Sequence, residues 1–150
     1  MKKYLLLLLV AVMLLTGGCN FKVEKDTFNI DRDKVDLIEI QREYTDKDGK
    51  ITYRCKKITD PADLDTMCDF VRTLSVKRAS NDKAHPVDAF SFIILVQGSI
   101  KHHLVMSEKM AYYDQIAYEY TDEDVYEEIK ELYDNLGYEE EDIEPTRFPK

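Results

Sequence analysis

The 150-residue chain contains no tryptophan and only three cysteines, five glycines and four prolines. It has no glycine-rich phosphate loop, no Gly-x-Ser-x-Gly nucleophile motif and no paired-cysteine metal knuckle, so common signatures of nucleotide-binding proteins, serine hydrolases and zinc proteins are missing. Basic residues are also few, because 21 Lys and Arg stand against 30 Asp and Glu and give a formal net charge of −9. With no basic patch in view, nucleic acid is a poor partner candidate.

A short apolar segment opens the chain. Lys2 and Lys3 precede an apolar run over residues 5–15, and the segment 14–19 reads Leu-Leu-Thr-Gly-Gly-Cys. A membrane-spanning helix needs about 20 mainly apolar residues, so this run is short for a retained anchor. Two basic residues, a short apolar run and small residues before a single cysteine indicate an export signal with a cleavage site specialised for lipid attachment.

The segment 14–19 resembles the lipobox of bacterial lipoproteins, although that family favours Leu where Thr16 stands. The resemblance implies that diacylglycerol is attached to Cys19, that a peptidase cuts after Gly18, and that the mature chain sits on the extracytoplasmic face of the cell membrane. A lipid with two chains meets the requirement for stable anchoring. Loss of residues 1–18, which hold two lysines and no acid, changes the formal charge from −9 to −11. The lipid, and no electrostatic attraction, must therefore hold the domain to an anionic membrane.

The remaining chain is predicted to form one domain. Residues 19–33 have no sustained apolar period and are expected to be a lipidated tether. Residues 34–137 carry the strand and helix patterns of a globular domain. Residues 138–150 are acidic with two prolines, and we expect a flexible tail.

Two β-rich runs, residues 35–44 and 51–58, surround the turn 46–49 (Asp-Lys-Asp-Gly) and predict a hairpin. The turn also resembles the middle of a calcium-binding EF-hand loop. The register excludes a calcium site, because Tyr44 and Cys55 then stand where that loop needs carboxylates.

The rest of the domain is predicted to hold a helix from Asp60, an irregular segment over 76–86, three strands and a closing helix. The three strands are expected over residues 88–97, 100–106 and 111–120, of which the last is either one strand or a pair of short strands. The closing helix begins at the acidic segment 121–124. This order, ββαβββα, predicts an α+β fold with a mostly antiparallel sheet of about five strands and two helices packed on it.

Strand and helix periodicity also predict which side chains are buried. In the strand 100–106, Ile100 and His102 are expected to face inward, while Lys101 and His103 face outward. In the closing helix, the expected core stripe consists of Val125, Ile129, Leu132 and Leu136.

Candidate chemistry is sparse. His102 and His103 are adjacent on a strand and point to opposite faces, so both cannot hold one metal ion there. A metal site would need His85 or distant carboxylates, and no zinc-type spacing is present. Asp114 is placed to pair with His102 across the sheet, and we expect that pair to serve structure.

Tyrosine and cysteine provide the remaining candidates. Tyr112, Tyr113 and His103 form a possible interaction surface, with Tyr113 as the exposed candidate. The exported compartment permits a disulfide between Cys55 and Cys68. The alternative is that both stay free, because Cys68 lies on the apolar face of a predicted helix and a free cysteine behaves as a small buried hydrophobe.

The pattern of residues 34–137 is similar to that of small lipoproteins of low-GC Gram-positive bacteria, which implies a cell-envelope location and no particular reaction. The first hypothesis is a non-enzymatic binding or accessory module for an envelope protein or a small ligand, without a cofactor other than the lipid. The second is an envelope hydrolase or metal-dependent enzyme. The third is a lipoprotein that blocks a phage or a toxin.

Overall fold

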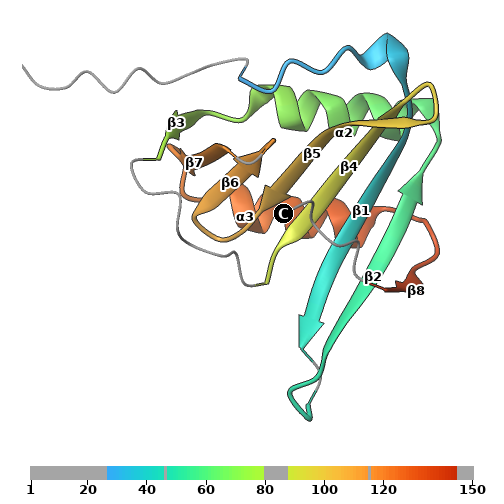
Figure 1. Cartoon of the computed structure of the whole chain (residues 1–150), viewed down its shortest axis with the longest axis vertical. Coiled ribbons are helices and arrows are strands. Elements are labelled where there is room, and N and C mark those ends of the chain that lie inside the picture. The colour runs from blue at the N-terminus through green and yellow to red at the C-terminus, as the bar shows by residue number, and fades with distance from the viewer. Residues whose placement is uncertain (1–26, 46, 80–87, 115, 145–150) are drawn as a thin grey trace, which may run out of the picture.

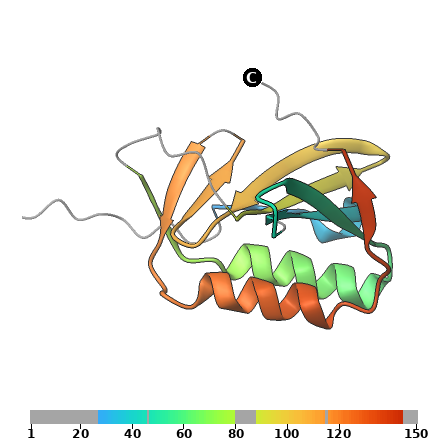
Figure 2. The same cartoon turned by 90° about the horizontal axis from the view of Figure 1, so that it is seen from below.

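The computed structural model describes residues 27–45, 47–79, 88–114 and 116–144. Within this part, eight strands form one antiparallel sheet and two helices lie side by side on one of its faces (Figure 1, Figure 2). The predicted α+β class, the antiparallel sheet and the two helices are therefore confirmed.

The sheet has the spatial order β3-β7-β6-β5-β4-β1-β2-β8. Its strands are β1 Val35–Thr45, β2 Ile51–Ile58, β3 Val76–Arg78, β4 Phe90–Val96, β5 Ser99–Met106, β6 Met110–Tyr113, β7 Ile116–Tyr120 and β8 Glu141–Ile143. The helices are α2 Pro61–Thr73 and α3 Val125–Asn135, and the short 3₁₀ turn η1 Arg32–Lys34 precedes β1. The apolar strand β4 lies in the interior of the sheet, between β5 and β1.

The expected five strands become eight because three short elements lack a strong sequence pattern. The run predicted over residues 111–120 is divided into β6 and β7, and Val76–Arg78 pairs with β7 although the sequence suggested an irregular segment there. In the expected tail, Glu141–Ile143 forms β8 at the edge of β2. Its acidic side chains find basic partners, since Lys57 lies 2.6 Å from Glu141 and Arg54 lies 3.6 Å from Asp142. The prediction of a flexible tail is thus wrong for this strand.

The expected tether also contributes to the core. Phe28 and Ile30 are only 1% and 2% exposed. The ring of Phe28 makes edge contacts with the rings of Tyr113 and Tyr118, at centroid distances of 5.0 and 5.5 Å. The folded domain therefore begins before residue 34, because these apolar side chains complete the core beneath β6 and β7.

Helix α2 follows its sequence signals closely. The side chain of Asp60 accepts a hydrogen bond from the backbone N–H of Ala62 at 2.9 Å, and Pro61 occupies the first helical position. The buried stripe consists of Leu64, Met67, Cys68 and Val71. Capping and periodicity are both local, which explains why the sequence predicted this helix well.

The predicted stripe of helix α3 is confirmed at three of its four positions. Val125, Ile129 and Leu136 are buried, whereas Leu132 is only partly buried and Tyr133 is buried beside it. The side chain of Tyr133 is 0% exposed and packs against the ring of Phe90 at a centroid distance of 5.5 Å. A tyrosine with a buried ring takes the position that apolar periodicity assigned to leucine.

A β-bulge changes the orientation of the first residues of β5. Ile94 pairs with His102 and the next residue, Leu95, pairs with Ile100, so Lys101 is the extra residue of the bulge. Ile100 is consequently 61% exposed, and the expectation that it faces inward is wrong.

Candidate functional site

The three residues predicted to share an interaction surface lie on two faces of the sheet. Tyr112 and Tyr113 are consecutive in β6, so their side chains alternate. Tyr113 lies on the helix side, where its ring contacts Phe28. Tyr112 pairs with Val105 and shares the opposite face with His103. The structure therefore brings Tyr112 and His103 to one face and places Tyr113 on the other.

Tyr113 is bonded to His102. Its hydroxyl forms a short hydrogen bond with Nδ1 of His102, and the two rings stack with an interplanar angle of 14°. Within the described ranges, no hydrogen bond or ion pair joins His102 to Asp114, contrary to the pairing that the sequence suggested. The backbone N–H of Asp114 instead donates to the carbonyl of His103 at 3.2 Å. His102 thus has the structural role that the sequence suggested, with a different partner.

His103 has a serine neighbour that the sequence did not reveal. The Oγ atom of Ser91 lies 2.7 Å from Nε2 of His103, on the sheet face away from the helices. Burial lowers the pKa of His103, and the charge of Asp114 opposes part of this shift. The imidazole is therefore largely neutral at pH 7. The only hint in the sequence is that Ser91 is the single polar residue in the apolar strand β4.

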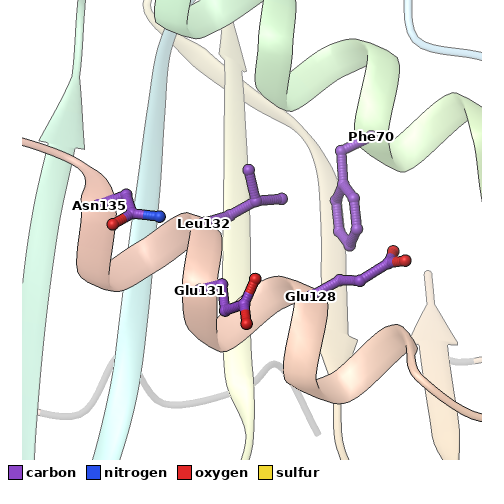
Figure 3. A pocket seen from close by; sticks show the side chains of 5 residues that line it. All are labelled: Phe70, Glu128, Glu131, Leu132 and Asn135. Atoms are coloured by element: carbon purple, nitrogen blue, oxygen red, sulfur yellow. The ribbon is translucent and has the colours of Figure 1, made fainter.

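A groove separates the two helices on the outer surface of the helix layer (Figure 3). Its volume is about 280 Å³, and it is lined by Phe70 of α2 and by Glu128, Glu131, Leu132 and Asn135 of α3. Phe70 and Leu132 are partly buried, and the three polar residues are exposed. The groove therefore has an apolar floor and a polar, acidic rim.

The rim carboxylates differ from the acids around them. Three neighbouring acids form ion pairs, namely Glu127 with Lys130 at 2.8 Å, Asp134 with Arg42 at 3.3 Å and Asp69 with Arg72 at 2.9 Å. Among the described residues, Glu128 and Glu131 have no such cation partner. Two carboxylates at the groove thus remain without an ion-pair partner among the described residues.

A second cleft, of about 740 Å³, lies between the β6–β7 hairpin and the start of α3. Its lining includes Glu108, Glu119, Asp122, Glu123 and Glu127 together with Tyr120 and Tyr126. Both tyrosines serve the fold, since Tyr120 donates to the carbonyl of Met110 at 3.0 Å and Tyr126 donates to the carbonyl of Asp88 at 2.6 Å. Both hydroxyls therefore donate hydrogen bonds within the fold.

A metal centre has no support in the described ranges, where no group of three histidine, cysteine or carboxylate residues is suitably placed. His85, which the sequence made a candidate, lies outside the described residues. The same holds for the predicted lipid attachment residue, Cys19.

Cys55 and Cys68 are both free and buried. Cys68 belongs to the core between the helices and the sheet. Lys56 points toward the helices, so its neighbour in β2, Cys55, points to the opposite face of the sheet. The sheet therefore separates the two thiols, and the structure contains no bond between them. Burial raises the pKa of Cys68 and raises that of Cys55 to about 11, so neither thiol is activated for nucleophilic chemistry.

Comparisons with known proteins add no identity, because no family model, no curated protein and no solved structure matches the chain. Within the described part, no helix has the length and apolar character needed to cross a bilayer.

Proposed function

We propose that this protein is a lipid-anchored binding module that acts on the extracytoplasmic face of the cell membrane. The observation that carries the proposal is the groove between α2 and α3, which exposes an apolar floor beside two carboxylates that lack a cation partner among the described residues. Exposed apolar surface next to unneutralised charge is the combination that a partner can cover with a gain in free energy.

The lipobox-like segment supports the location part of the proposal. A diacylglycerol on Cys19 holds the acidic domain at a surface that would otherwise repel it. Tethering also raises the local concentration of the domain near envelope proteins, so that even a small contact area becomes useful.

The proposal is tested by photo-crosslinking in the cell. A photoreactive amino acid replaces Asn135 at the groove, or Lys101, an exposed residue of β5, as the control. We expect a discrete adduct from position 135 in the anchored protein, no such adduct from position 101, and its loss in the Cys19→Ala variant. Absence of an adduct at 135, or the same products from both positions, would contradict a binding role for the groove.

Hydrolase activity is a second candidate, favoured by the 2.7 Å contact between Ser91 and His103. A neutral histidine beside a hydroxyl can accept its proton during attack on a carbonyl. However, Ser91 is only 6% exposed and lies in a strand paired on both sides, so nearby backbone N–H groups are engaged in the sheet. This candidate therefore ranks below binding.

A fluorophosphonate probe distinguishes the two candidates. In a hydrolase, Oγ of Ser91 attacks phosphorus, fluoride leaves and His103 takes the proton. The binding module should show no labelling of Ser91 after prolonged exposure. Labelling that disappears in both Ser91→Ala and His103→Asn would instead establish the hydrolase.

The third hypothesis, a lipoprotein that blocks a phage or a toxin, is a special case of binding. An adduct with a protein encoded outside the normal envelope machinery would support it.

A further inference from the structure

We infer that the groove between α2 and α3 accepts a cationic polypeptide segment that inserts one apolar side chain flanked by lysine or arginine. This inference rests on the proposed binding function and specifies the chemistry of the partner. It follows from the shape of the floor, the charge of the rim and the charge of the whole domain.

The floor selects an apolar side chain. Phe70 projects from α2 toward Leu132 of α3, and the two side chains face each other across the groove (Figure 3). Both remain partly exposed, whereas the next residue along each helix, Val71 and Tyr133 respectively, is buried. A side chain inserted here covers aromatic and aliphatic surface from both helices at once, as in the recognition of a segment by a groove between helices.

The rim selects positive charge next to that side chain. Glu128 and Glu131 lie three positions apart on α3, so their carboxylates lie on the same side of the helix. Asn135 follows one turn further along and offers an amide to backbone groups of the partner. Since neither carboxylate is in an ion pair among the described residues, an incoming lysine or arginine meets unneutralised charge at these two positions.

Other occupants fit less well. A nucleic acid or an anionic lipid surface meets repulsion from the rim and from the formal charge of −9 on the full chain. A second copy of this chain carries the same negative charge. A purely apolar segment would cover the two carboxylates without neutralising them. The carboxylates would then lose their hydration without gaining a hydrogen bond or an ion pair, which costs free energy.

The size of the groove limits the contact. A volume of about 280 Å³ lies at the lower end of the range of about 300–1,000 Å³ for small-ligand pockets. The groove therefore accommodates one or two side chains, and most of the binding area must come from the outer surfaces of the helices. We expect a transient interaction whose association rate falls as salt screens the rim charges.

The test uses the full lipidated protein in neutral detergent, with a photoreactive residue in place of Asn135. Three synthetic peptides share one helical scaffold: the first has a central leucine flanked by lysines, the second replaces the lysines with glutamates, and the third replaces the leucine with serine. The crosslinked fraction as a function of peptide concentration gives the apparent affinity at the groove itself. We expect the first peptide to bind most tightly and the second to give no crosslink.

A charge-matched pair of protein variants shows whether location or total charge matters. Glu128→Gln with Glu131→Gln should weaken binding of the first peptide about three- to tenfold. Asp122→Asn with Glu123→Gln removes the same charge from the other cleft and should change binding by less than about twofold.

Three results would overturn the inference: equal binding of the glutamate peptide, equal binding of the serine peptide, or equal loss in the two double variants. The broader binding proposal has its own readout. If the in-cell adduct from position 135 maps by mass spectrometry to a neutral or acidic segment, the cationic assignment is wrong and the binding function stands. If no adduct forms in cells, the binding function itself fails.

Discussion

At the scale of single residues, Lys56 shows how this fold accommodates a buried charge. The residue is only 6% exposed, and its Nζ donates to the backbone carbonyls of Tyr133 and Leu136, each at 2.8 Å. The same nitrogen lies 4.6 Å from the ring centroid of Tyr133. The ammonium group therefore lies at the negative end of α3, where it binds the carbonyl of Leu136 and shares the carbonyl of Tyr133 with the backbone N–H of Leu136, which lies 3.3 Å away.

Replacing this lysine should destabilise the domain. Lys56→Met keeps most of the side-chain volume but removes a buried hydrogen bond from each of the two carbonyls, so the free energy of unfolding should fall by about 1–3 kcal/mol. Lys57→Met is the matched control, because Lys57 is exposed and forms a surface ion pair with Glu141, worth at most about 1 kcal/mol. Urea denaturation compares the two variants. Equal losses would mean that Lys56 does not support the end of α3.

The two internal cysteines give a second prediction at this scale. Because Cys55 and Cys68 are buried with raised pKa values, iodoacetamide at pH 8 should modify neither in the folded Cys19→Ala protein. After unfolding in urea without a reductant, both should react, and mass spectrometry counts the added groups. If the two cysteines react in urea only after a reductant is added, they are bonded to each other.

At the scale of elements, the segment after α3, residues 138–143, contacts both the start of α2 and strand β2. The hydroxyl of Tyr138 donates to the carboxylate of Asp63 at 2.8 Å and accepts from the backbone N–H of Asp60 at 3.1 Å. Glu140 pairs with Arg54 at 3.1 Å, and β8 then covers the edge of β2. This segment thus connects the start of α2 with β2.

Truncation tests this connection. A chain that ends at Gly137 loses these contacts and exposes the edge of β2, so we expect a lower melting temperature and faster aggregation on heating. A loss of about 2 kcal/mol corresponds to roughly 8–16 °C for a domain of about 100 residues. The control ends at Glu144 and keeps every described strand. Identical melting of the two truncated chains would show that β8 contributes nothing to stability.

At the scale of the whole molecule, the arrangement separates two surfaces. Both helices cover one face of the sheet (Figure 2). Their outer surface carries the acidic groove. The opposite face carries Ser91, His103 and Tyr112. The chain reaches the first residues of the core, Phe28 and Ile30, soon after the predicted anchor at Cys19. We therefore expect a short connection between lipid and domain.

The anchor itself is directly testable. In the Cys19→Ala variant, metabolic labelling with a radioactive or alkyne-bearing fatty acid should be abolished, and the unprocessed precursor should accumulate, because a lipoprotein of the proposed kind receives its lipid on the thiol before cleavage. Wild-type protein and Cys55→Ala, which removes a buried thiol, are the controls. Continued labelling of Cys19→Ala would end the lipoprotein interpretation.

The sequence by itself determined the features that depend on neighbours in the chain. The cap at Asp60, the stripe of α2 and the β1–β2 hairpin follow from capping, periodicity and turn chemistry. The class of fold follows from the order of such elements. The lipobox-like segment ending at Cys19 is also local, and it remains the basis of the proposed location.

Only the tertiary structure decided the features that depend on partners far along the chain. Pairing with β2 turned an acidic stretch into β8, and a bulge turned Ile100 outward. Register placed Ser91 beside His103, and the packing of α3 buried Tyr133 and left Leu132 in the groove. Strand register and helix rotation are set by long-range packing, which no local pattern encodes, and the proposed binding site arises at that level.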